Sequence, residues 1–161
     1  MPLGPTRLTL PDWLARQVSA TAYETWLISE ADKLYARDQA KGVRRFTRTD
    51  YRRMLHAAIR RSAGLDYYTG EVLDWSLIAT PYPKPTGRKD MMRCGGRPSV
   101  DHYAGPGHPD YKLCRADTNH AKAYLGYGSF VALCRKVVAH ADRREAECAS
   151  RRAGGGGPGE T

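Results

Sequence analysis

The sequence predicts an α+β protein that is mostly helical and carries one small antiparallel β-hairpin. Apolar residues recur at helical spacing in three long stretches, 12–39, 51–64 and 129–152. Two short runs, 97–102 and 111–115, are typical of strands, and the loop 103–110 between them contains two glycines and two prolines. Since this loop is short, we expect the two strands to pair as a hairpin, followed by a helix that begins near Thr118.

The first two helices have recognisable start and stop signals. Thr9 followed by Asp12, with a proline in the first turn, predicts the start of a helix that Gly42 breaks. A second capping pair, Thr47 and Asp50, opens the next helix, which ends at its first glycine, Gly64. Large apolar residues on or near these helices are expected to anchor the core: Trp13, Trp26, Tyr51, Met54, Leu55, Ala58, Ile59 and Trp75.

Between the second helix and the hairpin, Thr69-Gly70 predicts a turn and 72–78 a strand-like run. A basic loop broken by Pro and Gly, residues 80–96, follows. In the last helix Cys134 lies on an apolar stripe, so we expect it in the core. Beyond it the glycine-rich end of the chain, 151–161, is expected to be disordered.

Composition favours a polyanionic partner. The 161 residues fit one domain, and the net charge of +9 favours nucleic acid first and an anionic membrane surface second. The N-terminus lacks the apolar segment of a signal peptide, and no stretch approaches the roughly 18 apolar residues of a membrane span. The four cysteines form no C-x-x-C, which argues against a zinc knuckle or a disulfide framework. We therefore expect a reduced, cytoplasmic protein with no membrane partner.

Four polar residues at the hairpin and the following helix form a candidate metal site. Asp101 supplies a carboxylate oxygen and Asn119 an amide oxygen, which suit Mg²⁺, Mn²⁺ or another divalent ion that keeps waters and takes further ligands from phosphate. His102 titrates near neutral pH and is a candidate general base for water attack on phosphorus. Lys122 lies one helical turn beyond Asn119, where it can contact a phosphate.

These residues resemble the HNH endonuclease superfamily, whose ββα-metal motif has a D-H pair on its first strand and N-x-x-K on its helix. The stretches "YYTGEVLDW" and "LCRADTNHAKAYLGYGSFVALCRKVVAH" are similar to flanking segments of bacterial HNH-type proteins. The resemblance covers about residues 50–140 and implies that Asp101 and Asn119 bind metal and that His102 is the base. It puts Asp110 where the family usually has the asparagine that orients the base. Zinc-binding cysteine pairs of many members are missing here.

The resemblance implies a division into an N-terminal helical segment, 1–46, an HNH-like domain, 47–150, and the tail. Nucleic-acid contacts are expected from the basic loop, the hairpin and its helix, at Lys84, Arg88, Lys89, Arg97, Arg115 and His120. A plain surface role is the alternative for His120. Arginines off the apolar stripe of the second helix form either a solvated face or a ridge that contacts phosphates: Arg48, Arg52, Arg53, Arg60 and Arg61.

The leading functional hypothesis is therefore a metal-dependent endonuclease that hydrolyses phosphodiester bonds in DNA, with RNA as another substrate left open. A second hypothesis is a catalytically inactive nucleic-acid-binding or adaptor protein on the same scaffold, which Asp110 favours. A third is a small interaction protein without a nucleic-acid partner. Monomer and homodimer are both compatible with one site per chain.

Overall fold

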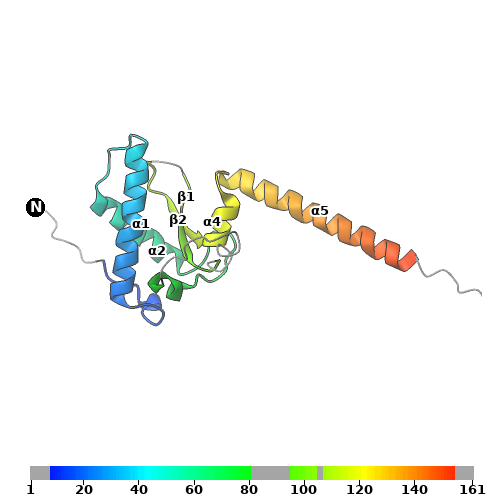
Figure 1. Cartoon of the computed structure of the whole chain (residues 1–161), viewed down its shortest axis with the longest axis horizontal. Helices are drawn as coiled ribbons and strands as arrows, with labels where there is room; N and C mark the ends of the chain where they lie inside the picture. The colour runs from blue at the N-terminus through cyan, green and yellow to red at the C-terminus, as the bar shows by residue number, and fades with distance from the viewer. Residues whose placement is uncertain (1–7, 81–94, 105–106, 155–161) are drawn as a thin grey trace, which may run out of the picture. The chain divides into compact units, whose positions relative to one another are not determined.

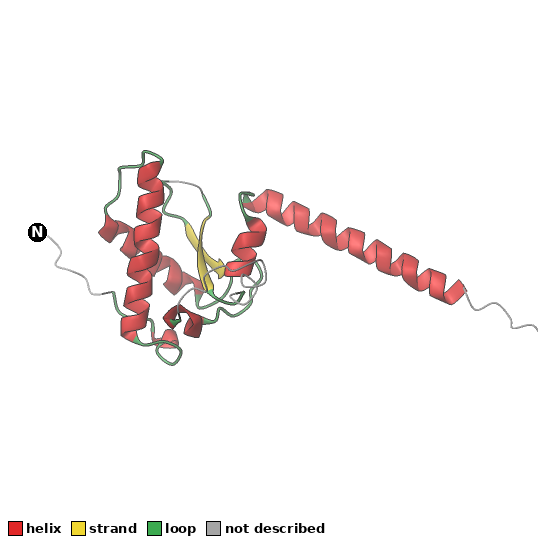
Figure 2. Cartoon of the chain, viewed as in Figure 1, coloured by secondary structure: helices red, strands yellow, loops and turns green. Residues whose placement is uncertain are grey.

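A computed structural model of the chain describes residues 8–80, 95–104 and 107–154. Its elements in chain order (Figure 1) are η1 (Asp12–Leu14), α1 (Ala20–Ala40), α2 (Arg48–Ser62), η2 (Trp75–Ala79), β1 (Pro98–His102), β2 (Tyr111–Arg115), α4 (Ala116–Lys122) and α5 (Tyr127–Gly154). They fall into two compact units, Met1–Ala123 and Tyr124–Thr161, which are described separately. Helices dominate the described residues, which contain one two-stranded antiparallel sheet (Figure 2), so the predicted fold class is confirmed.

The first long helix starts later than predicted. The signal at Thr9 and Asp12 leads only into the short turn η1, and α1 begins at Ala20. Ser19 has an extended backbone, and its Oγ accepts a hydrogen bond from the Ala22 N–H at 3.2 Å. A serine in this conformation interrupts a continuous helix and caps a new one.

The second helix follows its predicted signals closely. Thr47 and Asp50 make both hydrogen bonds of a capping box at the start of α2. The helix ends at Ser62, before Ala63 and Gly64, both of which have a positive φ. A Cβ at Gly64 would lie 2.8 Å from the Trp13 ring, so the turn requires glycine for space as well as for conformation.

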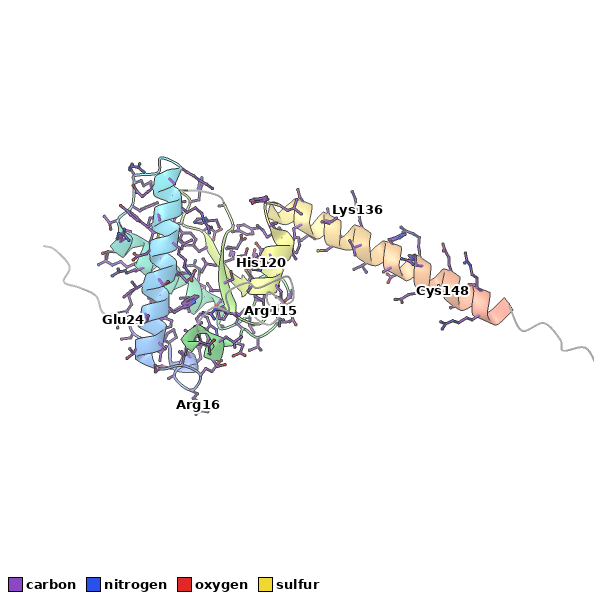
Figure 3. All side chains as sticks on the ribbon, viewed as in Figure 1. Arg16, Glu24, Arg115, His120, Lys136 and Cys148 are labelled. Carbon is purple, nitrogen blue, oxygen red and sulfur yellow. The ribbon has the colours of Figure 1, made fainter. Side chains whose placement is uncertain are left out.

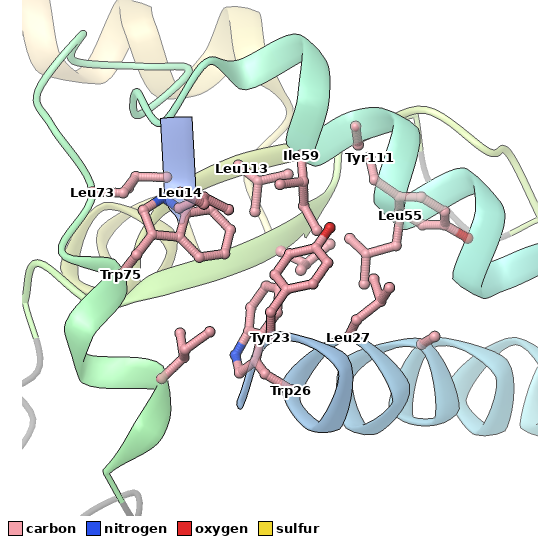
Figure 4. Packing of buried hydrophobic residues seen from close by; sticks show 14 of the residues in the cluster. Leu14, Tyr23, Trp26, Leu27, Leu55, Ile59, Leu73, Trp75, Tyr111 and Leu113 are labelled. Carbon is pink, nitrogen blue, oxygen red and sulfur yellow. The ribbon is translucent and has the colours of Figure 1, made fainter. Parts of the chain in front are cut away.

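The core lies between α1, α2, η2 and the hairpin. Trp75 has no exposed surface and packs beside Trp26 (Figure 4). Its ring makes edge contacts with Trp13 and Trp26, with centroids 5.9 and 5.3 Å apart. From α2, Leu55 and Ile59 are also fully buried. Helices α1 and α2 thus cover one face of the hairpin.

Residues 72–78 do not form the predicted strand. The pairing there is a single bridge between Leu65 and Val72, and a 3-10 helix, η2, follows. Asp74 explains the difference, because its Oδ1 accepts hydrogen bonds from the Ser76 N–H at 3.1 Å and from the Ser76 hydroxyl. A local cap of this kind overrides the β-propensity of the apolar residues.

The hairpin forms where the sequence predicted it, with β1 one residue shorter at its start. Val100 pairs with Leu113, Asp101 with Lys112 and His102 with Tyr111. Helix α4 follows β2 directly and contacts both strands. This order is the ββα arrangement that the sequence predicted.

The second unit consists of α5 and the residues around it. Cys134, predicted to be a core residue, is exposed on this helix. The helix continues to Gly154, so its last turn overlaps the predicted tail; residues 155–161 lie outside the described part. Within the described residues, no helix is both long and apolar enough to cross a membrane.

A buried histidine in α2 couples stability to pH. The side chain of His56 is hydrogen-bonded through Nδ1 to the Tyr23 hydroxyl at 2.7 Å. Burial, and secondarily the charge of Arg60, lowers the pKa of His56 below its ordinary value. In the unfolded chain the same imidazole takes up a proton near pH 6.5, so below that pH the unfolded state binds more protons at this residue than the native state does.

We therefore expect the free energy of unfolding to fall as the pH drops from about 6.5 toward the lowered pKa of the native protein. Urea unfolding followed by tryptophan fluorescence across this range measures the effect. The His56→Gln variant, which cannot titrate there, should lose less stability on acidification than the wild type. An equal loss in both proteins would contradict the assignment to His56.

Candidate active site at the hairpin and helix α4

Asp101 forms a buried ion pair with α4. The Lys122 Nζ lies 3.2 Å from each oxygen of the carboxylate, and the Tyr68 hydroxyl donates a hydrogen bond to Oδ2. Asp101 and Lys122 are only 6% and 5% exposed. Burial, with the hydrogen bond to Asp101 second, raises the pKa of Tyr68, so the phenol remains a donor. The positive charge that neutralises Asp101 is therefore supplied by a side chain of the protein, Lys122.

Asn119 lies one turn before Lys122 and connects α4 by hydrogen bonds to the face of β1 that carries Asp101. Its Nδ2 donates to Ser99 Oγ at 2.8 Å and approaches the Val100 carbonyl oxygen at 3.5 Å. Ser99 and Asp101 are two residues apart in the strand and therefore share a face. The amide group binds the strand through its nitrogen, which leaves Oδ1 as its oxygen donor.

His102 lies on the opposite face, toward α1. Its ring packs on its cross-strand partner Tyr111, with centroids 5.2 Å apart. Its Nδ1 is 3.3 Å from the Arg37 Nη1, and its Nε2 is 3.9 Å from the Asp38 Oδ1. The structure thus brings Lys122 into contact with Asp101 and places Asn119 on the same face of β1 through Ser99, and it separates the side chain of His102 from them at the end of β1.

The contact with Arg37 identifies the tautomer of His102. A guanidinium group can only donate hydrogen bonds, so the Nδ1 of His102 is the acceptor. The proton of the neutral ring is then on Nε2, directed at Asp38. Burial lowers the pKa of His102; the charge of Asp38 opposes this shift, while Arg37 and Lys41 add to it. The imidazole is accordingly neutral near pH 7 and carries its lone pair on Nδ1.

Asp38 is a buried carboxylate that the sequence analysis missed. It has no exposed surface, and its Oδ2 accepts hydrogen bonds from the Tyr51 hydroxyl at 2.6 Å and the Gly107 N–H at 3.1 Å. Within the described part of the chain, Oδ1 has no hydrogen-bond partner and neither has the Nε2 of His102. A signal was available: Asp38 follows Ala31 and Leu34 on the buried face of α1 at helical spacing.

Asp110, predicted to orient the base, forms its side-chain hydrogen bond with Lys112. Its Oδ1 accepts a hydrogen bond from the Lys112 Nζ at 2.7 Å, and its carbonyl oxygen accepts from the Tyr103 N–H. In the described residues, the carboxylate that faces His102 on its Nε2 side is therefore Asp38. The role of Asp110 in orienting the base stays a prediction.

The predicted nucleic-acid contacts differ in their surroundings. Arg97 is buried and donates to the Thr80 carbonyl oxygen at 3.1 Å. Arg115 pairs with Asp117 and more distantly with Glu71. His120 is exposed on α4 (Figure 3). The remaining three, Lys84, Arg88 and Lys89, lie outside the described residues.

The arginines of α2 fall into two groups, those that form ion pairs and those that are exposed. Arg48 forms an ion pair with Asp32 of α1 at 3.0 Å, and Arg52 approaches the same carboxylate at 3.9 Å. Arg53, Arg60 and Arg61 are exposed. Their exposure is compatible with both alternatives, a solvated face and a ridge that contacts phosphates.

The chemistry of the donors at the β1–α4 junction fits a hard divalent cation. One carboxylate oxygen and one amide oxygen come from two elements that pack together, and the Lys122 ammonium already neutralises Asp101. A divalent ion on Asp101 therefore has to displace this ammonium. No group of three His, Cys, Asp or Glu side chains suited to metal is found among the described residues, so an ion at this junction would need water or substrate oxygens as its other ligands.

Comparison of the chain with protein-family models, with curated proteins and with solved structures finds no match in any of the three.

Proposed function

We propose that the protein is a metal-dependent endonuclease that hydrolyses phosphodiester bonds in DNA. The observation that carries the proposal is the strand–strand–helix order in which Lys122 of α4 binds Asp101 of β1, while Asn119 of the same helix binds Ser99 on the same face of the strand. The net charge of +9 supports a polyanionic substrate.

In this proposal Asp101 and Asn119 would hold the divalent ion, which would supply charge stabilisation at the phosphate oxygens. His102 removes a proton from the attacking water through Nδ1, which requires that the Arg37 guanidinium first moves away from the lone pair of this nitrogen. Lys122, displaced from Asp101, is free to bind the phosphate. Because Asp101 and His102 face opposite sides of β1, the scissile phosphate binds at the end of the strand, where both faces are within reach.

Supercoiled plasmid incubated with Mg²⁺ or Mn²⁺, and in parallel with EDTA, tests the proposal. We expect metal-dependent nicking that falls by about 100-fold or more in His102→Ala, because general bases contribute roughly 10²–10⁴ in rate. Asn119→Ala should also lose activity. His140→Ala, which removes an exposed histidine from α5, is the matched control and should cleave like the wild type.

Wild-type cleavage by His102→Ala would refute the catalytic assignment. Cleavage that persists in EDTA would refute the requirement for a metal ion.

One observation favours a second function, a catalytically inactive nucleic-acid-binding protein on the same scaffold. The charge of Asp101 is already balanced by Lys122, and the neighbouring His102 points away from it. For such a protein, DNA binding weakens steeply with salt but is indifferent to Mg²⁺ and to Asp101→Asn. A gel-shift series over salt and Mg²⁺ with both proteins separates this function from the nuclease.

A further inference from the structure

We propose that Asp38 of α1 is the positioning residue for His102: it fixes the Nε2–H tautomer and so keeps the lone pair on Nδ1. This inference deepens the proposed nuclease function and rests on it for the role of the base. It places part of the catalytic apparatus in the N-terminal helix, outside the predicted motif.

The two oxygens of Asp38 have separate tasks. Oδ2 is held by the Tyr51 hydroxyl and the Gly107 N–H, which fix the carboxylate in the interior. Oδ1 remains for His102, whose Nε2 lies 3.9 Å away. Unpaired buried polar atoms are rare in native proteins, and here two of them face one another.

The preceding residue of the same helix acts on the other side of the ring. Arg37 donates to Nδ1, which excludes a proton there, and Asp38 attracts the proton on Nε2. Both contacts favour the same tautomer. A purely structural Asp38, which serves only Tyr51 and Gly107, has no effect on the tautomer of His102.

Asp38→Asn distinguishes these roles. The amide oxygen can still accept from Tyr51 and Gly107, while the NH₂ group is then directed at Nε2 of His102. A donor opposite Nε2–H is repulsive, so the ring is driven toward the Nδ1–H tautomer. That tautomer has no lone pair on the nitrogen that faces Arg37 and the substrate.

The experiment is ¹⁵N NMR of the imidazole of His102 in the full-length protein, at about pH 8 where the ring is neutral. We expect the Nε2–H form in the wild type and a shift toward Nδ1–H in Asp38→Asn. Plasmid cleavage by Asp38→Asn should show a kcat lower by about 100-fold or more with KM little changed, because the loss affects the base and not substrate binding.

Asp32→Asn is the matched control, because it removes a carboxylate from the same helix that faces Arg48. It should leave both the tautomer and kcat unchanged. An unaltered tautomer in Asp38→Asn overturns the inference. If the wild type cleaves no DNA but the tautomer still shifts, the nuclease proposal fails while the control of His102 by Asp38 stands.

Discussion

Replacing Lys122 with methionine is expected to destabilise the protein by about 3–5 kcal/mol, since breaking a buried ion pair leaves the opposite charge without compensation. Asp101 is then a buried carboxylate that keeps, among the described residues, the hydrogen bond from the Tyr68 hydroxyl. Urea unfolding followed by tryptophan fluorescence measures the loss.

Two comparisons separate the charge from the packing of the lysine stem. The double variant Asp101→Asn/Lys122→Met removes both charges and should recover most of the lost stability. Saturating Mg²⁺ should also stabilise Lys122→Met more than the wild type, because the ion no longer competes with an ammonium group. A stability of Lys122→Met within about 1 kcal/mol of the wild type would show that the pair is not formed in solution.

Trp75→Ala is expected to cost about 3–5 kcal/mol through loss of burial and the cavity that remains. Trp75 is fully buried between the rings of Trp13 and Trp26, so the cavity opens at the centre of the core. Thermal unfolding by circular dichroism gives the change. Trp75→Phe, which keeps an aromatic ring, should cost clearly less, and equal losses in the two variants would contradict a packing role.

The hairpin, α4 and the start of α2 could be predicted because their signals are local. Alternating strand residues, a short loop and the Thr47–Asp50 capping box each act over a few positions. The predicted start of α1 was wrong because two capping signals compete within about ten residues, and the one at Ser19 determines where the helix begins.

The surroundings of the candidate site could not be predicted in the same way. Arg37 reaches His102 across 65 positions of the chain and Tyr68 reaches Asp101 across 33, contacts that only tertiary packing creates. One feature of the site could have been predicted from the sequence, because neighbouring residues of a strand face opposite sides of the sheet. Applied to Asp101 and His102, this rule predicts the separation that the structure shows.

The most direct test of the nuclease account is a crystal structure of the protein saturated with Mn²⁺, with the ion located by its anomalous scattering. The account predicts Mn²⁺ bound to Asp101 and to the Oδ1 of Asn119, with the Lys122 Nζ displaced from the carboxylate. An ion pair between Lys122 and Asp101 that persists under these conditions, with no manganese at the junction of β1 and α4, would contradict it.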